Sequence, residues 1–200
     1  MQELIKPTEQ VISSYLQKFN DEPRFFLADQ VIERLIEKFP NNDNIESIWL
    51  KTSVINDLYS TNIYGTFKLA QHILQLNIDD KINKGVPDVV NEIAIGHKLL
   101  KSDGTGDRQF YSFATKYCSW HNREAYPIYD GFVHKVLVAY QKSNPFSSFK
   151  NPDLKDFNKF KDVIIDFRNM YNLKMYGLKE IDKFLWIYGK DLYSPSLIEV

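Results

Sequence analysis

The chain has 200 residues, of which 44% are hydrophobic, 26% charged and 14% aromatic, and its formal net charge is −1. This length suits one domain or two small helical lobes, and the near-zero charge argues against a non-specific polyanion binder. A single cysteine, Cys118, excludes an intrachain disulfide and favours a reducing compartment. We find no signal-peptide pattern and no apolar run of about eighteen residues, so we expect a cytoplasmic protein without a membrane span.

Apolar residues recur at helical spacing along most of the chain, and period-two strand patterns are absent. The sequence therefore predicts an all-α fold, a two-lobed helical bundle of about nine helices. Thr8 is a candidate cap of the first helix, and the acidic pair before Pro23 favours a second helix start. The expected helices cover about 11–19, 23–40, 45–59, 64–76, 88–100, the segment with Lys116, the segment after Asp130, 153–172 and 178–189.

We treat residues 1–200 as a single all-α domain, whose candidate lobes are 1–44 with 138–200, and 45–137. The segment 101–107 has two glycines and no apolar residue, so we expect a mobile connector there. Charge is uneven along the chain. Residues 1–50 carry 5 Lys or Arg against 9 Asp or Glu, whereas residues 97–142 carry 7 against 4. The second of these regions is basic enough to permit phosphate binding.

The most informative stretch is Ser112–Leu137, which reads SFATKYCSWHNREAYPIYDGFVHKVL. We expect Lys116 near the start of one helix, and Asp130, fourteen residues later, at the start of the next. An amine and a carboxylate at two helix starts suit imine-forming chemistry on a sugar. A helix start would also favour the ionised carboxylate of Asp130.

This stretch resembles the helix-hairpin-helix DNA glycosylase superfamily, most closely its 8-oxoguanine-glycosylase-like branch. In that superfamily a Gly-x-Gly-x-x turn enters the helix that carries the catalytic lysine, and a Pro-Val-Asp-x-x-Val segment supplies the catalytic aspartate. Ser112 and Ala114 stand at the two glycines, and Lys116 stands at the lysine. The segment 127–133, PIYDGFV, resembles the aspartate segment.

A second part of the resemblance lies upstream. The expected helix 48–59, followed by Ser60-Thr61-Asn62, is similar to the superfamily's helix that ends in a short polar DNA-probing turn. The resemblance therefore covers roughly residues 48–137 in order, and its specific part is under thirty residues long.

The resemblance implies a DNA-repair glycosylase with AP lyase activity that acts on a damaged base, such as an oxidised purine, in duplex DNA. The Lys116 amine would attack C1′ of a flipped nucleotide, and Asp130 would stabilise the positive sugar-like transition state. We expect no metal and no cofactor. The candidate DNA-binding residues are Ser112, Ala114, Thr115, Asn62 and His134.

Each of these residues also has a plain structural interpretation. Lys116 suits a solvated helix lysine, Asp130 suits a helix N-cap, and His134 suits a satisfied structural histidine. Cys118 and His121 have the i, i+3 spacing of metal ligands, but no second Cys/His pair lies nearby, so we expect no zinc site.

Two other classes of function stay open. One is a non-catalytic helical module that binds nucleic-acid backbone, and the other is a helical protein-interaction module. Either would suit a role in phage defence. Trp120 and Tyr129 fit base stacking under the nucleic-acid hypotheses and core packing otherwise.

Overall fold

The computed structural model describes residues 4–95 and 109–194. Over these residues the chain forms ten α-helices and one short 3₁₀ helix, with no β-strand. The predicted all-α class is therefore confirmed, and the prediction of about nine helices fits. The additional helix is the short α5 (Asp79–Asn83), which lies between the expected helices 64–76 and 88–100.

The chain divides into two compact units. We call residues 1–26 with 127–200 the terminal unit, and residues 27–126 the central unit. The candidate lobes from the sequence placed the divisions at 44/45 and 137/138. The contacts place them at 26/27 and 126/127, so α2 (Pro23–Lys38) begins in the terminal unit and continues in the central one.

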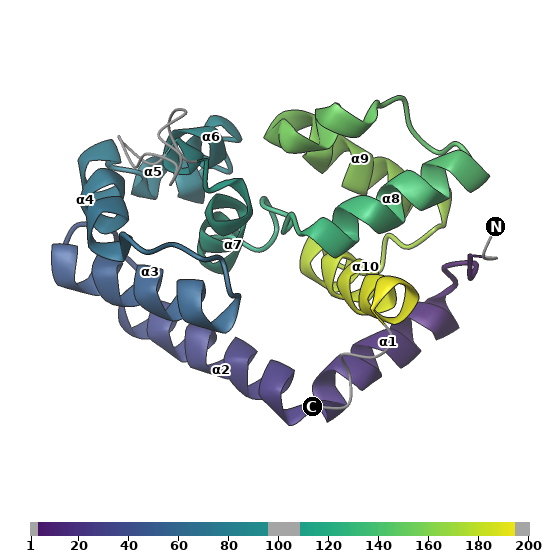
Figure 1. The fold of residues 1–200 in the computed structure, drawn as a ribbon, viewed down its shortest axis with the longest axis horizontal. Helices are drawn as coiled ribbons and strands as arrows, with labels where there is room; N and C mark the ends of the chain where they lie inside the picture. The colour runs from purple at the N-terminus through teal and green to yellow at the C-terminus, as the bar shows by residue number, and fades with distance from the viewer. Residues whose placement is uncertain (1–3, 96–108, 195–200) are drawn as a thin grey trace. The chain divides into compact units, whose positions relative to one another are not determined.

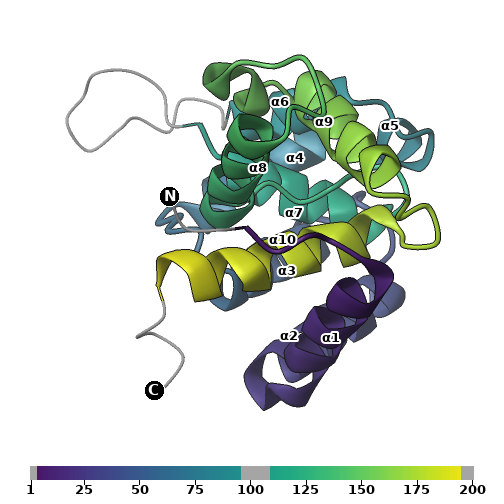
Figure 2. The same ribbon diagram turned by 90° about the vertical axis from the view of Figure 1, so that its right-hand side faces the viewer.

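The terminal unit is built around α10 (Leu178–Tyr193), which packs against α8 (Gly131–Ser143), α1 (Glu9–Asp21) and α9 (Phe157–Met170). Both ribbon views show α10, in yellow, between α8 and α1 (Figures 1 and 2). The 3₁₀ helix η1 (Asn151–Lys155) precedes α9 and packs on it. α10 carries a stripe of buried apolar side chains, which consists of Ile181, Phe184, Leu185 and Tyr188.

Aromatic rings supply much of the core of the terminal unit. Tyr188 stacks on Phe184 with ring centroids 5.8 Å apart, and Tyr15 meets both rings edge-on. Trp186 lies against Phe25, with centroids 4.9 Å apart. These rings bring large apolar areas out of water and thereby stabilise the terminal unit.

The central unit contains α3 (Ile45–Leu58), α4 (Thr66–Leu76), α5, α6 (Asp88–Ala94) and α7 (Tyr111–His121). α3 packs on α4, and α7 packs on α3, α5 and α6 (Figure 1). All eight residues from Phe113 to Trp120 are buried. A helix that is buried on every face belongs to the core.

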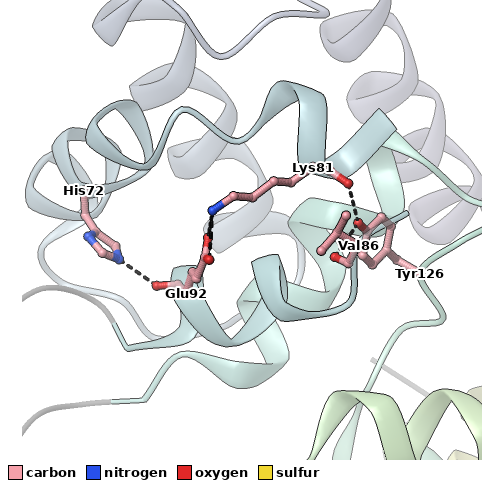
Figure 3. Close-up of polar contacts among 5 residues, drawn as sticks. All are labelled: His72, Lys81, Val86, Glu92 and Tyr126. Atoms are coloured by element: carbon pink, nitrogen blue, oxygen red, sulfur yellow. Dashed lines mark hydrogen bonds and ion pairs between the residues drawn. The ribbon is translucent and has the colours of Figure 1, made fainter. Parts of the chain in front are cut away.

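An ion pair and several hydrogen bonds hold α5 and α6 in place within the central unit (Figure 3). The Lys81 ammonium contacts both Glu92 carboxylate oxygens, at 2.8 and 2.7 Å, and His72 Nε2 lies 2.8 Å from the Glu92 carbonyl oxygen. The buried Tyr126 hydroxyl donates to the carbonyl oxygens of Val86 and Lys81, at 2.9 and 3.3 Å. Because the ion pair is partly exposed it adds little stability, whereas the buried Tyr126 hydroxyl needs these acceptors.

Helix ends follow local caps where the sequence provides them. Thr8 caps α1 by accepting from the Val11 N–H at 3.4 Å, as predicted. Asn44 caps α3 by accepting from the amides of its first turn. The predicted connector 101–107 and the end of the predicted helix 88–100 lie outside the described residues. None of the helices in the described part of the chain has the length and hydropathy to cross a bilayer.

Candidate functional site

Lys116 lies on α7 in the core of the central unit, with only 2% of its surface exposed. Its Nζ donates to Ser112 Oγ at 2.6 Å and stands 5.3 Å from the centre of the Tyr59 ring. The Tyr59 hydroxyl in turn accepts from Trp120 Nε1 at 3.1 Å. Ser112, Lys116 and Trp120 follow each other at four-residue spacing, so one face of α7 carries all three. We call this the lysine face of α7.

Lys116 stands in the middle of α7, because the helix begins five residues earlier at Tyr111. The prediction that Lys116 lies at the start of a helix is therefore wrong. Ser112 and Ala114 are helical, and the Ala114 N–H donates to the Phe110 carbonyl at 2.8 Å. Serine and alanine favour a helix more than glycine does, so the helix includes the two positions that resemble the hairpin glycines.

Two of the candidate DNA-binding residues have buried side chains. Ala114 and Thr115 are both fully buried. Thr115 Oγ1 donates to the Ser112 carbonyl at 3.0 Å, one turn back along α7. Ser112 is half-buried and accepts from Lys116. The sequence placed these residues next to the lysine, and the structure places Ala114 and Thr115 in the core of the central unit.

Asn62 is exposed on the turn that follows α3. Ser60 and Asn62 adopt left-handed backbone conformations, with φ of 50° and 56°. The Asn56 side chain holds this turn, because its Oδ1 accepts from Thr61 Oγ1 at 2.8 Å and from the Ile63 N–H at 2.9 Å. The polar turn predicted from Ser60-Thr61-Asn62 is therefore built as a short, hydrogen-bonded unit.

Asp130 is the N-cap of α8 in the terminal unit. Its Oδ1 accepts from the Phe132 N–H at 2.9 Å, and its backbone is extended. The predicted capping role is thus confirmed, and the carboxylate sits half-buried at the helix start. Carboxylates are favoured at this end of a helix because they face its unpaired N–H groups.

His134, one turn after Asp130, is held by two partners. Its Nδ1 lies 3.0 Å from the Tyr129 hydroxyl, and its Nε2 contacts Asn151 Oδ1. Tyr129 packs edge-on against Phe160, with centroids 5.5 Å apart, and burial together with the Asp130 charge raises the pKa of its hydroxyl. Tyr129 is therefore a packing residue here, and His134 links α8 to the start of η1.

The structure thus groups the predicted residues into two sets. Ser112, Ala114, Thr115 and Lys116 lie together on α7, and Asn62 lies on another turn of the same central unit. Asp130 and His134 share the first turn of α8 in the terminal unit.

The sequence missed a buried polar network around Lys51 of α3. Lys51 is fully buried, and its Nζ donates to the carbonyl oxygens of Phe39 and Asn41 and to Asn42 Oδ1, at 3.0, 2.8 and 2.8 Å. His121 Nε2 lies 3.2 Å from the same nitrogen. A sequence signal did exist, because this lysine occupies a position between apolar residues on the inward face of α3.

The network continues into α5 and α7. The Tyr117 hydroxyl donates to Asn42 Oδ1 at 2.5 Å, while the Asn42 amide and side-chain nitrogen donate to the two carboxylate oxygens of Asp79, at 2.8 and 2.6 Å. His121 Nδ1 lies 2.8 Å from the Tyr117 carbonyl, which makes Nδ1 the protonated nitrogen and Nε2 the acceptor that faces Lys51. These bonds fix α7, and with it the lysine face, against α3 and α5.

Burial perturbs the titration of two members of this network. It lowers the pKa of Lys51 to about 8, although the Asp79 and Asp43 charges act in the opposite direction. Burial, and then the nearby Lys51 charge, lowers the pKa of His121 to about 4. The network therefore contains a neutral imidazole at pH 7.

Among the described residues, no group of three His, Cys, Asp or Glu side chains is placed to hold a metal ion. Cys118 is buried, and burial raises the pKa of its thiol, which disfavours the reactive thiolate.

Comparisons with known proteins place the chain in a family. The HI_0787_N family model, described as an N-terminal domain, matches residues 11–125, which include Lys116 and end before Asp130. A Haemophilus influenzae protein with the name "Uncharacterized protein" is 40% identical over 153 residues, which is 76% of this chain and 71% of that protein. No solved structure matches the chain at a significant level. The chain therefore belongs to the HI_0787_N family.

Proposed function

We propose that this protein is a DNA glycosylase with AP lyase activity, which removes a damaged base such as an oxidised purine from duplex DNA. The nucleophile is the amine of Lys116, and the carboxylate that assists it is Asp130. The observation that carries the proposal is the position of Lys116. It is 2% exposed, and it lies on a core helix whose sequence resembles the lysine helix of such enzymes.

The chemistry assigned to Lys116 needs a lysine shielded from bulk water. Desolvation disfavours the ammonium form, and the neutral amine is the form that attacks. Ser112 supports this role because its hydroxyl oxygen, 2.6 Å from Nζ, accepts a hydrogen bond from the lysine and thereby orients the Lys116 side chain. The Tyr59 ring, 5.3 Å from Nζ, attracts the ammonium form and so holds Lys116 in place before the proton is lost.

In the proposed reaction the target nucleotide is flipped out of the duplex. Lys116 Nζ forms a bond to C1′ while the bond from C1′ to the base breaks, and the base leaves with a proton. Opening of the sugar then gives an imine between Nζ and C1′, from which elimination at the 3′ side nicks the strand. The Asp130 carboxylate stabilises the positive charge on the sugar and passes the protons.

Asp130 has the features that this role needs. Its Oδ1 is oriented by the Phe132 N–H at 2.9 Å, and the carboxylate sits half-buried at the positive end of α8. A capping carboxylate can serve catalysis as well as stability, because the helix N-terminus fixes the orientation of the carboxylate. Asn62, exposed on its rigid turn, is the residue that we assign to DNA contact.

The test is borohydride trapping. The protein is incubated with duplex DNA that carries either 8-oxoguanine or an abasic site, and borohydride reduces any imine to a stable protein–DNA adduct. We expect an adduct with the wild-type protein and none with Lys116→Gln. Lys116→Arg should also give none, since arginine keeps the positive charge but supplies no amine nucleophile.

Two further variants control the experiment. Lys135→Gln removes an exposed lysine on α8 and should trap like the wild type. Asp130→Asn keeps a good helix cap, so it should fold normally while base excision falls. DNA binding without any adduct would overturn the catalytic proposal in favour of a non-catalytic nucleic-acid module. No binding at low salt would favour a protein-interaction module instead.

A further inference from the structure

We infer that Asp182 of α10 is a positioning residue, which together with Gly189 holds Asp130 in its reactive orientation. This inference rests on the proposed function, because it takes Asp130 as the catalytic carboxylate. It assigns a role to α10 that the resemblance does not provide, and all of its contacts lie within the terminal unit.

The first observation is a buried carboxylate. Asp182 is 5% exposed, and its Oδ2 accepts from the Ile128 N–H at 3.2 Å. A carboxylate so deeply buried is costly unless it is hydrogen-bonded, so its presence among the apolar residues that α10 buries calls for a reason. Ile128 lies two residues before Asp130, in the segment that leads into α8.

The second observation is a close helix crossing. A Cβ on Gly189 would stand 2.8 Å from Phe132 Cβ and 3.1 Å from both the Phe132 carbonyl oxygen and Val136 Cγ2. The first turn of α8 therefore rests directly on the backbone of α10. Phe132 lies two residues after Asp130, and its N–H is the donor that orients the Asp130 carboxylate.

The two contacts belong to one face of α10. Asp182 and Gly189 are seven residues apart, which is close to two helical turns, so they point the same way. One contact fixes the chain two residues before Asp130, and the other fixes it two residues after. A single rigid helix thereby sets both flanks of the capping residue, and a misplacement of about 1 Å in such a site can lower a rate by roughly 100-fold.

A positioning role makes a prediction that a purely structural role does not. If Asp182 acts only through Asp130, its loss should matter no further once the Asp130 carboxylate is gone. The test measures single-turnover excision of 8-oxoguanine from duplex DNA at saturating protein, together with the dissociation constant for the same DNA. The variants are Asp182→Ala, Asp182→Asn, Gly189→Ala, Asp130→Asn and the double variant Asp182→Ala/Asp130→Asn.

We expect Asp182→Ala to lower the excision rate on the order of 10- to 100-fold while the dissociation constant changes by less than about 2-fold. Asp182→Asn, whose amide oxygen can still accept the Ile128 N–H, should recover most of the rate. Gly189→Ala should fall in rate like Asp182→Ala, because the added Cβ must push the first turn of α8 away. The double variant should be no slower than Asp130→Asn alone.

Leu185→Ala separates positioning from stability. It creates a cavity elsewhere on α10 and should lower the melting temperature without selectively lowering the rate. An additive loss in the double variant, or a wild-type rate in Asp182→Ala, would overturn the positioning role while the proposed function stands. An inactive wild-type protein would overturn both, and Asp182→Asn keeps the test decisive if Asp182→Ala does not fold.

Discussion

Lys51 offers the sharpest test of the buried network that fixes α7. We consider Lys51→Met, which keeps the length of the side chain and removes its charge. The substitution takes the donor away from the Phe39 and Asn41 carbonyl oxygens, while Asn42 Oδ1 keeps the Tyr117 hydroxyl at 2.5 Å. Two partly buried carbonyl oxygens and His121 Nε2 are thus left without this donor, at a cost of about 1 kcal/mol each and about 3 kcal/mol in total.

An opposing effect of similar size arises from the charge. Burial lowers the pKa of Lys51 from 10.5 to about 8, and each pKa unit corresponds to about 1.4 kcal/mol. The buried ammonium therefore costs roughly 3 kcal/mol at pH 7, and methionine avoids this cost. The two effects nearly cancel at pH 7, so we expect Lys51→Met to be close to the wild type in its free energy of unfolding there.

The pH dependence separates the two effects. The pKa of Lys51 is lower in the folded protein, at about 8, than its ordinary value of 10.5 in the unfolded chain. The stability linked to Lys51 is therefore fully present above pH 10.5 and is lost as the pH falls through about 8. Between pH 7 and about pH 9.5 the unfolded chain binds more protons at this residue. The wild type should therefore gain about 2 kcal/mol relative to Lys51→Met over this range.

The assay is urea unfolding followed by circular dichroism at several pH values, with the difference between the two proteins as the readout. Other lysines and tyrosines also titrate in this range, but their contributions cancel in the difference. Lys38→Met, an exposed substitution near the same loop, serves as the matched control and should show a constant difference. A difference between the wild type and Lys51→Met that stays constant within about 0.5 kcal/mol would refute the reasoning.

Two further predictions concern residues near the candidate site. Burial lowers the pKa of His121 from 6.5 to about 4, so the linked stability is present above pH 6.5 and lost as the pH falls through 4. Urea titrations should show an acid-dependent loss of up to roughly 3 kcal/mol that His121→Gln reduces, and equal acid sensitivity of the two proteins would contradict this. Asn56→Ala should cost about 2–3 kcal/mol, because three side-chain hydrogen bonds to Thr61 and Ile63 are lost. Asn56→Asp should cost less, and hydrogen exchange of the Ile63 amide should quicken in the alanine variant; an unchanged exchange rate would argue against the role of Asn56.

Local signals in the sequence predicted nine of the ten α-helices in the described part of the chain. Apolar residues at helical spacing predicted nine segments, and caps such as Thr8 and Asp130 act within one turn of the chain, so they could be identified without a structure. The short α5 was missed because five residues are too few to show a period. The start of α7 was misplaced because the hairpin resemblance suggested a turn at Ser112–Ala114, whereas the residues themselves favour a helix.

The chemical identity of the candidate residues also came from the sequence, in that Lys116 and Asp130 were selected by their order and spacing. Their surroundings depend on residues far away along the chain. The hydrogen bond between Tyr59 and Trp120 on the lysine face joins residues 61 positions apart in the sequence. The bond between Asn42 and Tyr117 spans 75 positions, and the bond between Asp182 and Ile128 spans 54. Helical periodicity says which side of a helix faces inward, but it does not say what lies opposite that side. Only the packing of the helices decides which polar groups meet in the low-dielectric interior, and that packing determines how Lys51, Lys116 and Asp182 are buried.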